Sequence, residues 1–390
     1  MCISKRFLWK KISPEDEKHY FFGYYDRCPW NDDDSLHLCL KVNQASRLPV
    51  KGETAEIGVL DGSGSFEHLA TTRTWCHQQG AMELFLPHRN QFIYNDFDGE
   101  KVVARIYEMG KGIVGKYNRG IYTISPNGRF GISLDFARIP RRGYSYAEAP
   151  LPDDVHPKNL DHDGLWLVDL VSGAEKLLVS YSTMLKKHPW RYSCEDVSFW
   201  LNHAIFNCDS SRILWLFRQH TQANVLGNWW HTFMYTCDLE GRDTACVLPE
   251  TYWHSGAISH QIWGRTPHEI LVDANWDGTG NHAVVFDESQ RPFLAKKISE
   301  SHGGMAHMVF SPDGTKLLAD SYPVNGKQQL DLIDVATGKM EQLGVFAHQQ
   351  PKGTVAEVRC DLHPRWSHDG KKITVDSIHS GKRAVYLLKL

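Results

Sequence analysis

A short turn motif repeats along the chain, and this repeat constrains the fold more than any other feature. Residues 311–316 read Ser-Pro-Asp-Gly-Thr-Lys, and close copies begin at Ser125 and Ser367. Four looser copies bring the number to seven, and they lie near Asp32, His88, Asp209 and Thr266. Short runs of alternating or β-branched residues separate the turns, as in strands. Units of roughly 40 to 55 residues with two hairpins each are typical of propeller blades. The sequence therefore predicts an all-β, seven-bladed β-propeller.

The two ends and one long spacing refine this prediction. The last unit has room for three strands before Leu390, so we expect a strand from residues 7–12 to complete that blade and close the ring. Residues 1–390 then form a single domain. The spacing from Asn127 to Asp209 is about thirty residues longer than the repeat requires, and the excess falls at about 137–159. We interpret it as an insertion loop on one face, where function is more frequent than in a regular turn.

Composition excludes some classes of function. A formal net charge of -3 argues against a broad nucleic-acid-binding face. No apolar run of about 18 residues and no secretory leader pattern occur, so we expect neither a membrane span nor export. The nine cysteines are scattered without a CxxC pair, which fits reduced thiols in a cytoplasmic protein. These features do not indicate an oligomeric state.

One position of the repeat, six residues before the turn residue that matches Asp313, should face the axial channel. Four consecutive blades place histidine there: His203, His260, His307 and His363. With 21 histidines in 390 residues, seven random positions would hold fewer than one. We expect the imidazoles to converge, to bind a divalent metal or to act as general base or acid near neutral pH. The alternative is that they fill the channel and bond to the backbone.

The other blades place different residues at this position. Blade one has Asp26 after Tyr24 and Tyr25, and blade three has Ile121. Blade two has Met82, preceded by Gln79, which we include among the candidates for substrate binding.

The insertion supplies a second group of candidates. Arg138, Arg142 and Tyr144 lie in a stretch where arginines alternate with tyrosines. Guanidinium groups bind carboxylates with two parallel hydrogen bonds, and aromatic rings stack on sugar faces. Composition alone fits a solvated basic loop equally well.

Two further regions carry candidate residues. His231 lies with Arg218 and a Trp-Trp pair in the long connection 217–233, where aromatic residues either form a platform for carbohydrate or pack between blades. Arg359, four residues before His363, is a candidate for binding a substrate carboxylate.

At 305–314 and 360–366 the chain resembles the oligogalacturonate lyase family of propeller polysaccharide lyases, and more distantly the propeller ulvan lyases. In that family the matching positions hold a metal, typically manganese, with three histidines and a glutamine. The resemblance implies metal ligation by His307 and His363, with Asp361 in place of the third histidine. The family's catalytic arginine falls near His231, where this chain has no arginine, so the resemblance leaves His231 or His260 as the base.

These observations lead to one main hypothesis, β-elimination at a 4-linked hexuronate within an acidic oligosaccharide. The metal, or Arg359 with the arginine loop, would neutralise the C6 carboxylate and acidify the C5 proton. His260, with His203 or His231 nearby, would remove that proton. Tyr24, Tyr25 or another acid would protonate the leaving oxygen.

Two alternatives stay open. A propeller glycoside hydrolase that cleaves next to a uronate would give a saturated product containing the oxygen of water. A non-catalytic binding propeller would keep its binding when the four histidines are replaced.

Overall fold

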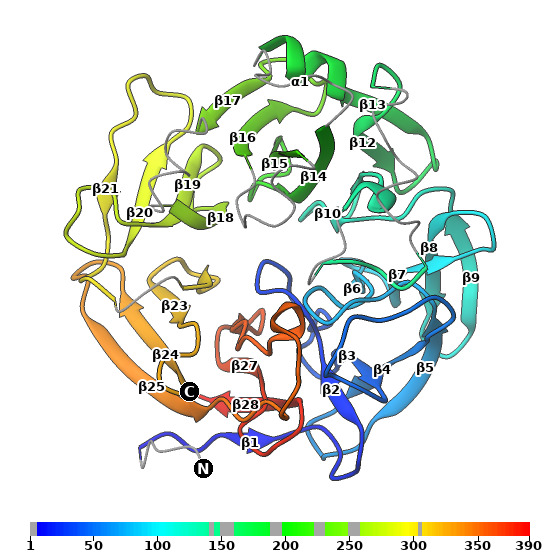
Figure 1. Ribbon diagram of the computed structural model, residues 1–390, viewed down its shortest axis with the longest axis vertical. Coiled ribbons are helices and arrows are strands. Elements are labelled where there is room, and N and C mark those ends of the chain that lie inside the picture. Colours follow the sequence, from blue (N-terminus) through cyan, green and yellow to red (C-terminus); the bar gives the residue numbers. More distant parts are fainter. Residues whose placement is uncertain are drawn as a thin grey trace.

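The computed structural model describes residues 6–139, 144–148, 160–187, 197–221, 231–248, 258–302 and 306–390. Seven four-stranded antiparallel sheets stand in a ring around a central axis, which confirms the predicted seven-bladed propeller (Figure 1). Within each sheet the first strand along the chain lies nearest the axis, except that the last blade takes its outermost strand from the N-terminal segment.

The strands of the first three blades run outward in chain order. Blade one contains β2 (His19–Phe21), β3 (His37–Val42), β4 (Ala55–Leu60) and β5 (Glu67–Thr72). Blade two contains β6 (Leu84–Phe85), β7 (Gln91–Phe97), β8 (Val102–Glu108) and β9 (Gly112–Tyr117). Blade three contains β10 (Thr123–Ile124), β11 (Phe130–Ser133), β12 (Gly164–Asp169) and β13 (Glu175–Ser180).

The remaining blades follow the same order. Blade four contains β14 (Val197–Phe206), β15 (Arg212–Thr221), β16 (His231–Asp238) and β17 (Ala245–Leu248). Blade five contains β18 (Ile258–Trp263), β19 (Glu269–Ala274), β20 (His282–Asp287) and β21 (Lys296–Lys297). Blade six contains β22 (Met308–Phe310), β23 (Lys316–Asp320), β24 (Lys327–Asp334) and β25 (Met340–Ala347). Blade seven contains β26 (Arg365–Trp366), β27 (Lys372–Ser377), β28 (Ala384–Lys389) and β1 (Lys10–Lys11).

The repeated turn owes its sequence to a side-chain hydrogen-bond pattern. Ser311 Oγ donates to Asp313 Oδ1 at 2.6 Å and accepts from the backbone N–H of Lys316 at 2.9 Å. Gly314, at φ +69°, takes the left-handed conformation that a residue with a Cβ adopts only at a cost. The copies at Ser125 and Ser367 repeat the same bonds, which explains why Ser-x-Asp/Asn-Gly marks the blades.

The N-terminal segment closes the ring as predicted. Strand β1 pairs antiparallel with β28, with Lys10 opposite Leu387. Ile12 continues the pairing by donating its N–H to the carbonyl of Val385 at 3.0 Å. The outer edge of blade seven is therefore covered by a strand from the opposite end of the chain.

Tryptophans at the inner strands connect neighbouring blades. Trp263 of blade five donates its indole N–H to the carbonyl of Ile205 in blade four, and Trp366 of blade seven donates to Val309 in blade six. The buried core lies between adjacent sheets, as in other propellers.

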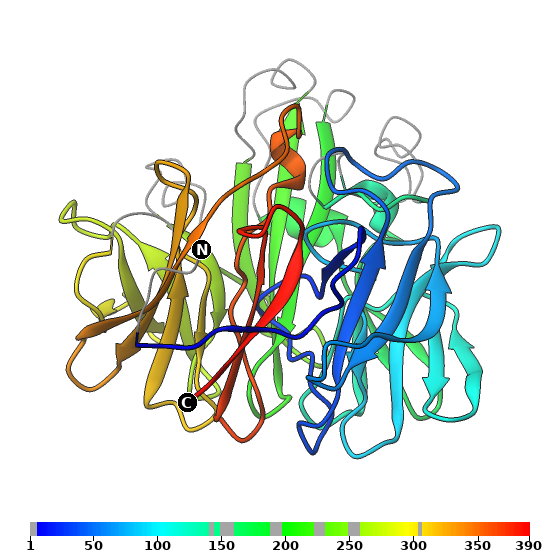
Figure 2. The ribbon, with the colours of Figure 1, turned by 90° about the horizontal axis from the view of Figure 1, so that it is seen from below.

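The long spacing between blades three and four has two sources. The 3-10 helix η1 (Phe136–Arg138) and residues 144–148 belong to the predicted insertion between β11 and β12. Helix α1 (Tyr181–Lys187) follows β13 and adds residues outside the insertion predicted at about 137–159. On one face of the ring, the segment with the 3-10 helix η5 (Ala356–Val358) projects above the blades (Figure 2). No helix among the described residues has the length and apolarity needed to cross a membrane.

Candidate active site

The four axial histidines meet at the centre of the ring. All are buried, and the ring centroids of His260 and His307 lie 4.1 Å apart, with His363 4.4 Å from His307. Tyr24 connects His203 to the group, with centroid distances of 5.1 Å to His203 and 4.9 Å to His363. The repeat position selected from the sequence therefore brings imidazoles of four blades into one cluster.

Three of the four axial histidines have a left-handed backbone conformation. His203, His260 and His363 have φ values of 49°, 50° and 44°, and Met82 at the same position of blade two has 58°. The left-handed conformation costs roughly 1–2 kcal/mol for such residues and persists only where the surroundings fix it. In blades four and five it coincides with register shifts of the inner strand pair. Such bulges redirect a side chain, and here they direct it into the channel.

Hydrogen bonds fix the ring orientation of two candidate ligands, His307 and His363. The Nδ1 atom of His307 lies 3.0 Å from Asp320 Oδ2, and Nδ1 of His363 donates to the carbonyl of Gly23 at 2.8 Å. Burial lowers the pKa of His307, but the Asp320 carboxylate outweighs this effect and raises it above the usual value. With partners at Nδ1, the Nε2 atoms are the candidate ligand atoms, as is usual for histidines that bind a metal.

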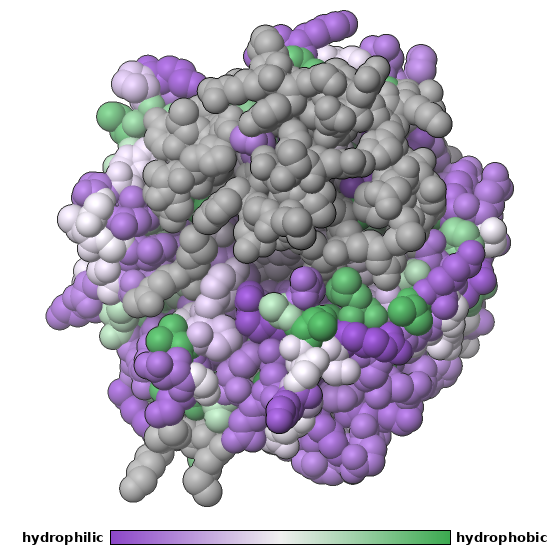
Figure 3. Space-filling view, in the orientation of Figure 1, coloured by the Kyte–Doolittle hydropathy of each residue, from purple (hydrophilic) through white to green (hydrophobic). Residues whose placement is uncertain are grey.

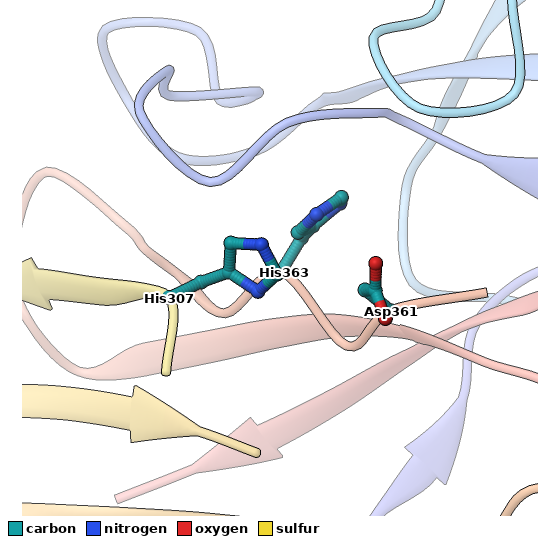
Figure 4. Close-up of side chains that lie close together, drawn as sticks. All are labelled: His307, Asp361 and His363. Atoms are coloured by element: carbon teal, nitrogen blue, oxygen red, sulfur yellow. The ribbon is translucent and has the colours of Figure 1, made fainter. Parts of the chain in front are cut away.

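Asp361 completes a set of three candidate ligands. One ligand atom from each of His307, Asp361 and His363 lies within 4.8 Å of the others (Figure 4). Both Asp361 oxygens also accept hydrogen bonds from Arg359, at 2.6 Å from Nε and 2.8 Å from Nη2. Burial raises the pKa of Asp361, yet the guanidinium lowers it by more, so the carboxylate is charged. An imidazole and carboxylate set of this kind suits a divalent ion such as manganese.

His260 is placed for proton transfer. Its Nε2 lies 3.0 Å from the hydroxyl of Tyr322, and its Nδ1 lies 3.8 Å from Asp273 Oδ2. Burial and the neighbouring His307 lower the pKa of His260, which keeps the ring neutral at pH 7. A neutral imidazole beside a hydroxyl is a base paired with an acid.

Four tyrosines surround the imidazoles. Tyr25 packs on His307 at 5.0 Å, and Tyr144 of the insertion packs on His203 at 5.5 Å. Tyr322 lies beneath the guanidinium of Arg359, whose Cζ is 4.2 Å from the ring centroid. Burial raises the pKa of all these phenols, Tyr24 included, so each one is a neutral hydrogen-bond donor and proton source.

Arg218 adds a second cation. It lies in β15 opposite Thr232, one residue from the pairing of Gln219 with His231. Its side chain is half-buried, and its charge adds to the effect of burial in lowering the pKa of His203. An arginine is therefore present beside His231, on the neighbouring strand, although His231 itself is not one. The half-buried His231 begins β16.

Two predicted substrate-binding residues make internal contacts instead. Arg138 is buried, pairs with Asp163 at 2.5 Å and lies over the ring of Tyr181. Gln79 donates to the hydroxyl of Tyr122 at 2.7 Å and accepts from Tyr146 at 2.8 Å. Both polar groups are engaged within the protein, and their assignment to substrate binding stays a prediction. Arg142 lies outside the described residues.

The sequence interpretation missed Tyr322 and the carboxylates behind the histidines. A signal for the carboxylates exists, since Asp273, Asp320 and Asp376 each stand thirteen residues after an axial histidine, and Asn95 stands thirteen after Met82. Each accepts a backbone N–H of the next blade at the axis: Ala306, His363, Gly23 and Ile121, in the same order. Tyr322 follows β23 outside any repeat position, so no pattern identifies it.

Comparison with solved structures places this fold beside two oligogalacturonate lyases. One, solved in complex with manganese, is 14% identical and aligns over 100% of this chain and 94% of its own, with a TM-score of 0.66. The other, from Vibrio parahaemolyticus, is 11% identical over 100% and 95%, also with a TM-score of 0.66. A puromycin-hydrolyzing peptidase of Mycobacterium tuberculosis reaches a TM-score of 0.51 at 11% identity, over 94% of this chain and 53% of its own.

No protein-family model and no curated protein sequence matches the chain. The similarity inferred from the sequence is thus confirmed at the level of the fold.

Proposed function

We propose that the chain is a lyase that cleaves an acidic oligosaccharide by β-elimination next to a uronate. The observation that carries the proposal is the neutral His260 bonded to Tyr322 at 3.0 Å, beside the Arg359 guanidinium. A base, an acid and a carboxylate-binding cation are the three groups that this elimination needs. The seven described cysteines are free thiols, which supports a cytoplasmic location as part of the proposal.

Carboxylate binding falls to the arginines. Arg359 uses Nε and Nη2 on Asp361, and its remaining N–H groups can bind the C6 carboxylate of the uronate. Arg218 carries a second positive charge at the same cluster. Drawing negative charge out of the carboxylate makes the C5 proton more acidic, because the enolate-like transition state is stabilised.

His307, Asp361 and His363 fit a divalent cation, by ligand type and by the orientation of both imidazoles. When bound there, the ion would add positive charge that stabilises the substrate carboxylate. Asp361 would share its oxygens between the ion and Arg359.

His260 and Tyr322 divide the proton transfers. With Asp273 on the Nδ1 side, Nε2 of His260 is the basic atom and accepts from the Tyr322 hydroxyl. When substrate binds between them, Nε2 takes the C5 proton and Tyr322 donates its proton to the leaving oxygen. The C5–H and C4–O bonds break, a C4=C5 double bond forms, and the proton on His260 returns to Tyr322. Tyr25 packs on His307 instead, which makes it the weaker candidate for the acid.

The test is incubation of the purified protein with uronide oligosaccharides in water enriched in oxygen-18. Elimination gives absorbance near 235 nm and products whose masses carry no heavy oxygen. A saturated product that contains heavy oxygen would establish a hydrolase instead. Binding without any product would favour the non-catalytic propeller.

A further inference from the structure

A cavity, here called the side pocket, lies between blades five and six. Its volume is about 450 Å³, within the range of ~300–1,000 Å³ typical of small-molecule sites. His302, bridged to Asn281, forms the blade-five wall, and the end of β23 with the first half of β24 forms the opposite wall. The surface of the described residues on this face of the ring is largely hydrophilic (Figure 3).

The strand geometry of blade six builds the floor of the side pocket. Lys327, Gln329 and Asp331 alternate along β24 and so share one face of the sheet. Asp331 is paired with Ala319 on the neighbouring strand, and the small methyl side chain of Ala319 leaves space for a ligand. A two-residue Asn-Gly hairpin, closed by the pairing of Val324 with Lys327, holds the rim. The polar groups are therefore positioned before a ligand arrives.

The side pocket adjoins the axial cluster through shared residues. Asp320 lines it and also holds Nδ1 of His307, and the next residue but one is Tyr322, bonded to His260. On the other wall, His302 lies 3.3 Å from Asp273, the carboxylate behind His260. The stretch 320–322 therefore joins the two sites, because Asp320 and Ser321 line the side pocket and Tyr322 is one of the proposed proton-transfer groups.

The lining of the side pocket favours substrate hydroxyl groups over a second substrate carboxylate. Asp331 is half-buried, and no described residue gives its carboxylate a hydrogen bond or an ion pair. Burial raises the pKa of Asp331 to about 6, so the carboxylate is largely charged at pH 7. A uronate would bring like charge against Asp331 and Asp320, whereas neighbouring sugar hydroxyls can donate to both oxygens of Asp331. Lys327 is exposed at the rim, where solvent screens its charge.

We propose that the side pocket binds a neutral sugar residue adjacent to the uronate, so that the substrate is a mixed acidic saccharide rather than a pure polyuronide. This inference rests on the proposed lyase function. Asp331 and Gln329 bind the hydroxyls of the neutral sugar, and the axial cluster binds the uronate.

Calorimetric titration tests the inference without requiring catalysis. The full chain carrying His260→Ala is titrated with two tetrasaccharides, one alternating galacturonate with rhamnose and one of galacturonate alone. Adding Asp331→Ala should weaken binding of the alternating tetrasaccharide about tenfold, because hydrogen bonds to a charged group are lost, and leave tetragalacturonate unaffected. Asp334→Ala is the matched control, because Asp334 lies on the same strand, forms an ion pair with Lys316 and does not line the side pocket.

Each other outcome overturns the inference. Equal affinity of the Asp331→Ala and Asp334→Ala proteins for the alternating tetrasaccharide removes the role of the side pocket. An equal loss for both tetrasaccharides shows a general effect, and absence of binding by either excludes this substrate class. Failure of the lyase proposal is seen separately, as a lack of 235 nm product from either oligosaccharide with the unmodified chain.

Discussion

Removal of the Tyr322 hydroxyl is the sharpest test of the proton-transfer assignment. Tyr322→Phe keeps the ring beneath Arg359 and against His260 and His307, and deletes the atom that lies 3.0 Å from His260 Nε2. A positioned general acid contributes roughly 10²–10⁴-fold, which corresponds to about 2.7–5.5 kcal/mol of transition-state stabilisation. The folded state loses one hydroxyl–imidazole hydrogen bond, worth about 1 kcal/mol. We therefore expect kcat to fall at least about a hundredfold in a protein that still folds.

The assay is the initial rate of absorbance near 235 nm with a saturating uronide, beside thermal unfolding of both proteins. Tyr386→Phe is the control, because the Tyr386 hydroxyl donates to Ser380 Oγ at 2.9 Å on the outer side of blade seven and its loss removes a comparable bond. We expect the control to keep its rate. A Tyr322→Phe rate within about threefold of the unmodified rate would refute the assignment and move the acid to Tyr25.

Three other predictions concern metal binding, substrate binding and the pH dependence of stability. His363→Ala should lose a stoichiometric divalent ion detected by plasma mass spectrometry, while His379→Ala, off the axis, should retain it; retention in both would exclude the ligand set. Arg359→Lys should raise KM about tenfold with oligouronides, because an ammonium cannot form the paired bonds with Asp361 and also offer further N–H groups to the substrate carboxylate. An unchanged KM would contradict a carboxylate-binding role. Burial lowers the pKa of His77 from 6.5 to about 3, so the unfolded chain protonates first as pH falls and stability is lost below pH 6.5. Between pH 7 and 5 the free energy of unfolding, measured with denaturant, should therefore fall by about 2 kcal/mol less in His77→Gln than in the unmodified chain. An equal fall in both proteins would contradict this.

The fold was predictable because its signal is local and repeated. The Ser311, Asp313 and Gly314 contacts form within six residues, so they can be inferred from the sequence without knowing what the blade packs against. Closure by β1 was also predictable, because a three-stranded last blade would leave an unpaired edge. The register of the axial histidines followed from the same turns, even in blades four and five, where the turn residues are less regular.

The contacts that join distant segments could not be read in this way. The partner of Arg138 is Asp163, at a separation of 25 residues, and no sequence pattern indicates this pair. Gln79 is likewise satisfied by Tyr146, 67 residues away. Tyr322 was identified as a candidate only through its hydrogen bond to His260. Charged and amide groups bond to whatever the fold brings near them, and sequence position does not determine that neighbour.

The second-strand carboxylates explain how a propeller of repeated blades can hold a precise axial cluster. Asp320 accepts the backbone N–H groups of His307 in its own blade and His363 in the next, and it also holds His307 Nδ1. The interaction that joins blades six and seven thus also sets the orientation of an imidazole. Asp376 makes the corresponding connection from blade seven to Gly23 of blade one, with Arg365 as its ion-pair partner in place of an imidazole. Because the same carboxylate positions connect the blades and support the axis, the geometry of the histidine cluster depends on the ring itself more than on the surface loops.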